Sequence, residues 1–274
     1  MYQPAIFASG YAGFKLFERT TPRQMEAFSR SAEVKRDIAY FMEKIGEAAT
    51  PADLVADRRL LKVALGAFGL GEEIDKRAFI RKALEGGTEA RDAFANRMSD
   101  ARWRAFASAF GYGDSAGAQT GKPGFAAGIA DRYRERAFEA AVGATDENFR
   151  LAMNFRREAA AIASAAETDR AGWLKMLAQK PLRAVLEGAL RLPKAMAHLD
   201  IDRQVAIVED KARETFGSSS PAALASPEIM DKALRRFFVR ADLATASANA
   251  PGSTALTLLS NASAASLLLS NAIR

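Results

Sequence analysis

The segment Gly113-Asp114-Ser115-Ala116-Gly117 matches the G-x-S-x-G pattern that surrounds the nucleophilic serine of many hydrolases. In those enzymes the serine lies on a tight turn between a strand and a helix, and a histidine later in the chain is its base. His198 is the only histidine, and Asp131, Asp146 or Asp169 would orient it. However, a helical pattern precedes the segment and a loop pattern follows it. A serine hydrolase is therefore kept only as an alternative.

Two phosphate-binding patterns are incomplete in the same region. The stretch from Ala116 to Pro123 resembles a P-loop, but alanine replaces its first glycine and proline replaces its hydroxyl residue. Gly111 and Gly113 begin a dinucleotide fingerprint that has no glycine at position 116. We therefore expect no nucleotide cofactor.

His198, Asp200 and Asp202 lie close together in the segment HLDIDRQ and raise the question of a metal site. The chain has no cysteine and no second histidine, so the usual transition-metal ligands are lacking. An aspartate just before an apolar periodic stretch is typical of a helix N-cap. We expect Asp200 or Asp202 to cap the following helix, and we expect no metal ligands, cofactor-binding residues or catalytic residues.

The charge of the chain is modest and mixed. Its 274 residues contain 39 Lys and Arg against 33 Asp and Glu, a net charge of +6. Basic residues alternate with acidic ones, and doublets such as Arg156-Arg157 stand alone, which is typical of solvated helix faces. Binding of nucleic acid or of an anionic surface is therefore a weaker alternative. No stretch approaches the ~20 apolar residues of a membrane span, and the uncharged start of the chain does not resemble a signal peptide. We expect a cytoplasmic protein.

Signals for helix starts and stops recur along the chain. Thr21-Pro22, Thr50-Pro51 and Ser226-Pro227 each place an N-cap residue before a proline in the first turn. Gly69 and Gly111 are the last residues of the two copies of the tripeptide Ala-Phe-Gly and are expected to end helices in the left-handed conformation. These signals and the apolar periodicity predict an all-α fold, an irregular array of about ten to twelve helices. The predicted helices lie near 32–45, 50–68, 75–85, 89–98, 100–110, 129–142, 146–166, 181–191, 202–216, 227–243 and 253–272.

The predicted domain organisation has one main boundary. Residues 1–216 are expected to form the main helical domain, with a sub-boundary in the glycine-rich stretch 111–128, and residues 217–274 a linker followed by C-terminal helices. The segments 41–54 and 138–149 share a helix, glycine and capped-helix order, which is compatible with a weak internal repeat of a helix pair but also recurs by chance in helical chains. Trp103 and Trp173 are expected in the core.

Several short segments of the sequence resemble those of a known family. They are Tyr11-Ala12-Gly13-Phe14, Asp57-Arg58-Arg59-Leu60-Leu61, Arg102-Trp103-Arg104, Pro181-Leu182-Arg183 and Asp200-Ile201-Asp202-Arg203-Gln204. Together they resemble the alphaproteobacterial domain of unknown function 1217, over residues of about 10 to 216. The resemblance implies a connection with motility, because members are often encoded among flagellar genes. It brings no catalytic residues.

These observations lead to one main hypothesis. We expect a non-enzymatic helical protein that assembles or operates the flagellum through protein–protein contacts, either as a cytoplasmic assembly factor or as an exported structural component. Flagellar components are the expected partners, and self-association is the second partner hypothesis. The alternatives are the serine hydrolase and the weak binder of nucleic acid or anionic surfaces.

Overall fold

The structure is a computed structural model that describes residues 2–248. Within this range the chain forms twelve α-helices, five short 3₁₀ turns and no β-strand, which confirms the predicted all-α array. The α-helices, in chain order, are α1 (Gly10–Ser29), α2 (Ala32–Lys44), α3 (Pro51–Ala56), α4 (Arg58–Gly66), α5 (Arg77–Glu85), α6 (Ala101–Phe110), α7 (Phe125–Gly143), α8 (Glu147–Ala165), α9 (Asp169–Leu177), α10 (Lys180–Leu190), α11 (Ile201–Phe216) and α12 (Pro227–Ala248). The predicted helix at 253–272 lies outside the described residues.

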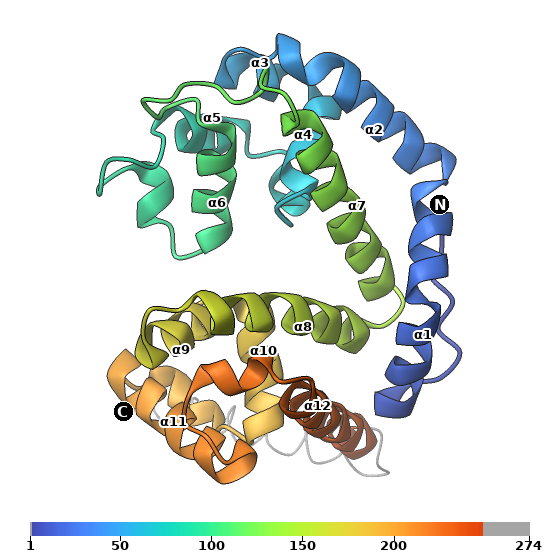
Figure 1. The fold of residues 1–274 in the computed structure, drawn as a ribbon, viewed down its shortest axis with the longest axis vertical. Helices are drawn as coiled ribbons and strands as arrows, with labels where there is room; N and C mark the ends of the chain where they lie inside the picture. Colours follow the sequence, from blue (N-terminus) through green and yellow to red (C-terminus); the bar gives the residue numbers. More distant parts are fainter. Residues whose placement is uncertain (1, 249–274) are drawn as a thin grey trace, which may run out of the picture.

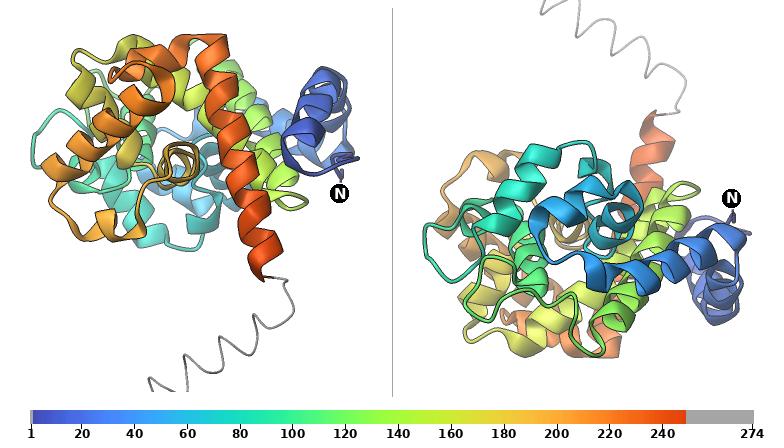
Figure 2. Two further views of the ribbon diagram at one scale, coloured as in Figure 1. Left: turned by 90° about the horizontal axis from the view of Figure 1, so that it is seen from below. Right: turned by 90° about the horizontal axis from the view of Figure 1, so that it is seen from above.

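The helices form an upper and a lower group in the view of Figure 1. Helices α2 to α7 make the upper group, and α8 to α12 make the lower one. Helices α7 and α8 are consecutive and pack against each other, so they join the groups. Helix α1 runs along one side and contacts α12 of the lower group and α7 and α2 of the upper one. The two further views in Figure 2 show α12 as a long helix that crosses the lower group. No α-helix of residues 2–248 has the length and hydrophobicity needed to span a membrane.

Three phenylalanines from distant parts of the chain hold α1 to the lower group. The ring centroids of Phe14 and Phe238 are 5.2 Å apart, those of Phe14 and Phe149 5.4 Å, and those of Phe149 and Phe238 5.7 Å. All three side chains are essentially inaccessible to solvent. Burial of each contributes about 1.5–3 kcal/mol relative to exposure, so the triangle fixes where α1 lies over α8 and α12.

The Thr50-Pro51 signal begins a helix as predicted, but that helix is shorter than expected. Thr50 and Asp53 form a reciprocal capping box at the start of α3. The predicted single helix over 50–68 is wrong, because Asp57 has extended backbone and ends α3. Its carboxylate accepts hydrogen bonds from the amides of Arg59 (2.8 Å) and Leu60 (3.0 Å) and so caps α4.

Three other features differ from the predicted elements. Thr21-Pro22 does not begin a helix, because Pro22 lies inside α1. The predicted helix over 89–98 is reduced to the 3₁₀ turn η3 (Phe94–Arg97). Helix α9 occupies a stretch for which no helix was predicted. Its start is marked by Thr168, whose hydroxyl accepts a hydrogen bond from the amide of Ala171 at 3.2 Å.

The two Ala-Phe-Gly tripeptides end helices, as predicted. Gly69 has φ +70°, its amide donates to Gly66 at 3.0 Å and the amide of Leu70 donates to Leu65 at 2.9 Å, the two bonds of a Schellman motif. Gly111 has φ +66° and its amide donates to Ala107 at 2.9 Å, the single bond of the simpler left-handed cap.

The glycine-rich stretch after α6 is fixed to the body of the fold. The hydroxyls of Tyr112 and Thr120 both donate to the carbonyl oxygen of Ala48, at 2.8 and 3.0 Å. Gly113 lies so close to Gly87 that a Cβ at Gly113 would be 2.3 Å from the Gly87 nitrogen. The loop therefore packs against the α2–α3 connection and against the end of α5.

The serine- and alanine-rich stretch after α11 is also packed. It contains the 3₁₀ turn η5 (Pro221–Ala225), in which Pro221 and Leu224 are buried, and η5 contacts α8. The indole nitrogen of Trp173 donates to the carbonyl of Ser219 at 2.8 Å. Trp173 and Trp103 are both buried, as predicted. The domain boundary at residue 216 and the internal repeat stay predictions.

Candidate functional site

The serine of the G-x-S-x-G segment joins two loops. The Ser115 hydroxyl donates to a carboxylate oxygen of Glu89 at 2.5 Å, and its backbone amide donates to the same oxygen at 3.0 Å. The neighbouring Asp114 carboxylate accepts from the amides of Thr88 (2.5 Å) and Glu89 (3.2 Å). The segment therefore holds the loop after α6 against the loop after α5, and its hydroxyl is engaged with a carboxylate instead of an imidazole.

The structure does not bring the proposed triad together. His198 lies in the 3₁₀ turn η4 (Lys194–His198) between α10 and α11, whereas the serine segment follows α6 in the other group of helices. Asp131 pairs with Arg134 on α7. Asp146 caps α8 and Asp169 accepts a hydrogen bond from Ser220 at 2.6 Å.

Asp200 caps α11, as predicted. Its carboxylate accepts from the amide of Arg203 at 2.9 Å. In the described part of the chain, no three histidine, aspartate or glutamate side chains are grouped as ligands of a metal ion.

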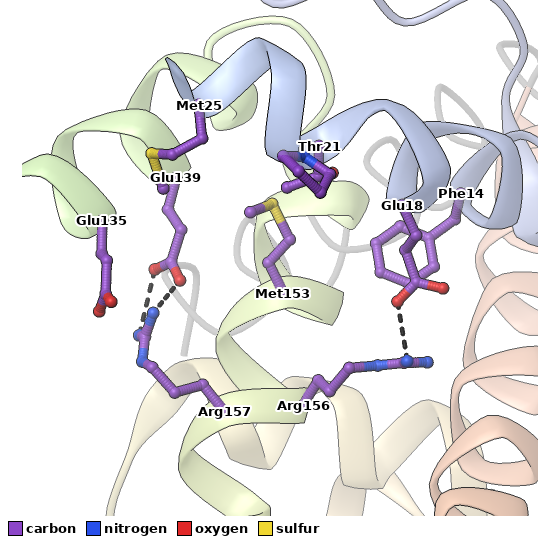
Figure 3. Close-up of a pocket in the computed structure, with 10 residues that line it drawn as sticks. Phe14, Glu18, Thr21, Met25, Glu135, Glu139, Met153, Arg156 and Arg157 are labelled. Atoms are coloured by element: carbon purple, nitrogen blue, oxygen red, sulfur yellow. Dashed lines mark hydrogen bonds and ion pairs between the residues drawn. The ribbon is translucent and has the colours of Figure 1, made fainter. Parts of the chain in front are cut away.

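A cavity of about 410 Å³ lies where α1 passes over α7 and α8 (Figure 3). We call it the α1–α8 cavity. Its walls combine apolar side chains with carboxylates and two guanidinium groups, and its lining residues are Phe14, Glu18, Thr21, Pro22, Met25, Glu135, Glu139, Met153, Arg156 and Arg157. Pro22 and Glu135 are exposed, so the cavity opens to solvent beside them.

Helix α1 supplies one wall of the cavity because its lining residues recur every three or four positions, which places them on one face. Pro22 stands in the middle of this face and has no amide hydrogen. The carbonyl of Glu18, four residues earlier, therefore lacks its usual helical donor. The Thr21 hydroxyl donates to the carbonyl of Phe17 at 3.0 Å.

Helix α8 supplies the opposite wall, and there Arg156 is fixed by carboxylates of two other helices. It pairs with Glu18 of α1 at 2.9 Å and with Asp231 of α12 at 2.5 Å. Lys15 of α1 pairs with the same two carboxylates, at 3.0 and 3.3 Å. The four side chains form a closed ring of alternating charge that ties α1, α8 and α12 together.

A second ionic network lies between α7 and α8 at the inner end of the cavity. The carboxylate of Glu139, which is 7% exposed, accepts hydrogen bonds from both terminal nitrogens (Nη1 and Nη2) of Arg157. Arg136 pairs with Glu158 at 2.6 Å, and the side-chain oxygen of Asn154, with its amide oriented to satisfy the network, accepts from both arginines. Burial raises the pKa of Glu139, although the two guanidinium groups oppose this. Burial also lowers the pKa of Arg136, with the Arg157 charge acting in the same direction.

A second cavity of about 300 Å³ shares part of its lining with the first. It is lined by residues of both groups of helices, namely Ala67, Phe68, Ala105, Arg132, Glu135, Arg136, Arg157 and Glu158. Glu135 and Arg157 line both cavities. Among the described residues, Glu135 has no hydrogen bond or ion pair, and it is therefore a free carboxylate at the rim of both cavities.

The α1–α8 cavity has the size of a binding site. Ligand pockets in proteins commonly measure about 300–1,000 Å³ and combine an apolar lining with a few polar groups. Met25 and Met153 face each other across it (Figure 3). Methionine side chains adapt to differently shaped apolar groups. The cavity can therefore receive apolar side chains of a binding partner.

No pattern in the sequence predicts this cavity. Its lining comes from α1 and from the consecutive helices α7 and α8, more than a hundred residues later in the chain, and none of these segments contains a motif. The one available signal is the Arg156-Arg157 doublet, whose isolation in the sequence favours the interpretation of a solvated helix face. That interpretation is wrong, because both side chains are half-buried and paired with carboxylates of other helices.

Comparison with known proteins identifies the family but no activity. Residues 67–228 match the family described as Protein of unknown function (DUF1217). A crystal structure of a protein from Agrobacterium tumefaciens, solved by a structural genomics consortium, has a similar fold, with a TM-score of 0.69 and 27% sequence identity. The match covers 87% of this chain and 98% of that one. Curated protein sequences gave no match. Because the family match spans more than half of the chain, this protein belongs to the DUF1217 family, as its resemblance predicted.

Proposed function

We propose that this protein is a non-enzymatic helical binding protein of the motility apparatus, and that it receives a partner protein in the α1–α8 cavity. The observation that carries the binding part is the cavity itself, in which adaptable apolar side chains lie between fixed ionic networks. The link to motility rests on the resemblance to a family whose members are often encoded among flagellar genes. A cytoplasmic assembly factor is the first version of this proposal, and an exported component is the second.

The arrangement of charges supports binding over catalysis. Arg156 and Arg157 are each held by two carboxylates. Groups held in this way keep the shape of a binding surface but are not available to transfer protons to a substrate. The cavity walls belong to long helices, and rigid elements position a binding surface more precisely than loops do.

The experiment is an affinity purification of the full-length tagged chain from motile cells of its native host. Met153→Glu places a charge in the cavity, whereas Met42→Glu makes the same change at an exposed position of α2 (46% exposed). We expect the wild-type chain and Met42→Glu to recover the same flagellar component, identified by mass spectrometry, and Met153→Glu to lose it. Equal recovery by all three chains, or recovery of no flagellar component by the wild type, would contradict the proposal.

A further inference from the structure

We infer that the α1–α8 cavity selects a basic amphipathic helix of its partner, with apolar side chains inside the cavity and a lysine or arginine on Glu135. The inference rests on the proposed function and adds the chemistry of the partner. The inference follows from the polar groups of the cavity, some of which already have a hydrogen-bond or ion-pair partner in the protein and some of which do not.

The charges of both arginines in the cavity are paired with carboxylates, and the one guanidinium nitrogen without a hydrogen-bond partner in the described part of the chain, Nε of Arg156, is buried. The guanidinium of Arg157 is shared between Glu139 and Glu158, and that of Arg156 between Glu18 and Asp231. An acidic partner group would have to displace one of these carboxylates, and breaking such a pair leaves a charge without its partner.

The exposed charged group of the cavity that has no partner within residues 2–248 is an acceptor. Glu135 is exposed at the rim and has no ion pair or hydrogen bond among the described residues. On the facing helix, the carbonyl of Glu18 lacks its helical donor because Pro22 has no amide hydrogen. The charged side chains of the lining are three glutamates and two arginines, a local charge of −1. A cation therefore complements the rim, and apolar groups complement the methionines behind it.

The preference for a cationic helix belongs to the cavity alone, because the net charge of the whole chain has the opposite effect. The whole protein carries +6 and repels a cationic helix at long range. Binding of such a helix would therefore have to come from contacts at the cavity and not from a general attraction.

The test uses two synthetic helices with fluorescent labels, one built of leucine and lysine at amphipathic spacing and one with glutamate in place of each lysine. Their binding to the full-length chain is measured by fluorescence anisotropy. We expect the lysine helix to bind the wild type and the glutamate helix not to bind. Glu135→Gln should weaken binding of the lysine helix roughly threefold, as expected for one partly exposed ion pair, and Glu135→Lys should weaken it further.

The matched control is Glu167→Gln, which removes the same charge from another exposed glutamate that has no ion pair in the described part of the chain. It should leave the affinity unchanged. Circular dichroism and thermal unfolding establish that each variant is folded.

Three outcomes separate this inference from the proposed function. If Met153→Glu abolishes binding but both peptides bind equally and Glu135→Gln has no effect, the charge preference is wrong and the cavity remains a docking site. If Met153→Glu has no effect either, docking in the cavity is wrong. If sedimentation shows that the wild type dimerises and Met153→Glu is monomeric, the occupant is a second copy of this chain, and the inference is overturned.

Discussion

Two helix interfaces of this protein are built on opposite principles. Between α10 and α12 the contact is mainly apolar and close: Leu186 and Leu234 are fully buried, and Gly188 lies where an added Cβ would be 3.0 Å from the ring of Phe237. One hydrogen bond crosses this contact, from Nε of Arg236 to the carbonyl of Ala189. Between α7 and α8 the centre of the contact is ionic and contains Glu139 and Arg157. Helix α8 also contacts α10 and α12. The two cavities are nevertheless lined by residues of α7 and α8 and by none of α10 or α12.

The difference shows how the fold separates stability from binding. Apolar side chains pack without directional requirements, so the α10–α12 contact fills its space and leaves no room for a partner. In a buried ionic network, each charged group that lacks a partner costs free energy, and packing apolar side chains against it does not remove that cost. The α7–α8 interface therefore stabilises the fold only while it is intact, and it leaves shaped space beside it.

The largest expected effect is at the ionic interface. Glu139→Ala leaves two arginines without their shared carboxylate, and we expect the free energy of unfolding to fall by about 3–5 kcal/mol. Chemical denaturation measures it. The control Asp210→Ala removes a carboxylate from an exposed pair with Arg213, and should change stability by less than about 0.5 kcal/mol. Similar values for the two variants would mean that the network does not hold α7 on α8.

The apolar interface should respond to loss of volume. Leu234→Ala creates a cavity between α10 and α12, and we expect a loss of about 3 kcal/mol in the same measurement. Leu16→Ala, at a position 45% exposed on α1, is the control and should cost far less. Leu234→Ala should keep the affinity of the cavity for the lysine helix, and a loss of that binding would argue against the separation of the two interfaces.

A smaller effect is expected where two loops touch. At Gly113 a Cβ would be 2.3 Å from the backbone nitrogen of Gly87, so Gly113→Ala forces the loops apart, at a cost of about 1–3 kcal/mol. Gly121 lies in the same loop and has open space around it. Gly121→Ala should therefore be neutral within about 1 kcal/mol. Thermal unfolding distinguishes the two variants, and equal melting temperatures would show that the contact does not constrain the fold.

The smallest effect is a pH dependence at the cap of α4. Burial raises the pKa of Asp57, but hydrogen bonds from the Tyr40 hydroxyl and from the amides of Leu60 and Arg59 lower it by more. A carboxyl whose pKa is lowered by folding contributes stability above its ordinary pKa of about 3.9, and this is lost as the pH falls through the lower, folded value. The substitution Asp57→Asn keeps a side-chain oxygen that can cap the helix but removes the titrating group. The difference in stability between about pH 6 and about pH 3 should be smaller in this variant than in the wild type, and an equal difference would contradict the account.

The helices could be predicted from the sequence because their signals are local. The capping box at Thr50 and the left-handed glycines at 69 and 111 act within a few residues. The errors arose where a distant contact overrides a local signal. Pro22 is tolerated inside α1 because the helix is held on both sides of it by burial of phenylalanines against α12 and α7.

The candidate site could not be predicted for a related reason. Nothing in the sequence around Glu18, Glu135 and Arg156 links them, and only the packing of α1 over α8 brings them to one cavity. Conversely, the G-x-S-x-G pattern was easy to find, but its Ser115 serves a loop contact with Glu89. In this protein local patterns predict the elements, whereas the binding surface depends on contacts between elements.

The central claim, that a partner protein lies in the α1–α8 cavity, is tested most directly by photo-crosslinking in motile cells. Benzoylphenylalanine is introduced in place of Met153 inside the cavity and, in a separate chain, in place of Met42 on the exposed face of α2. The account predicts a covalent adduct between the chain labelled at position 153 and a flagellar protein, and no such adduct from position 42. An absence of adducts at position 153, or the same adducts from both positions, would contradict it.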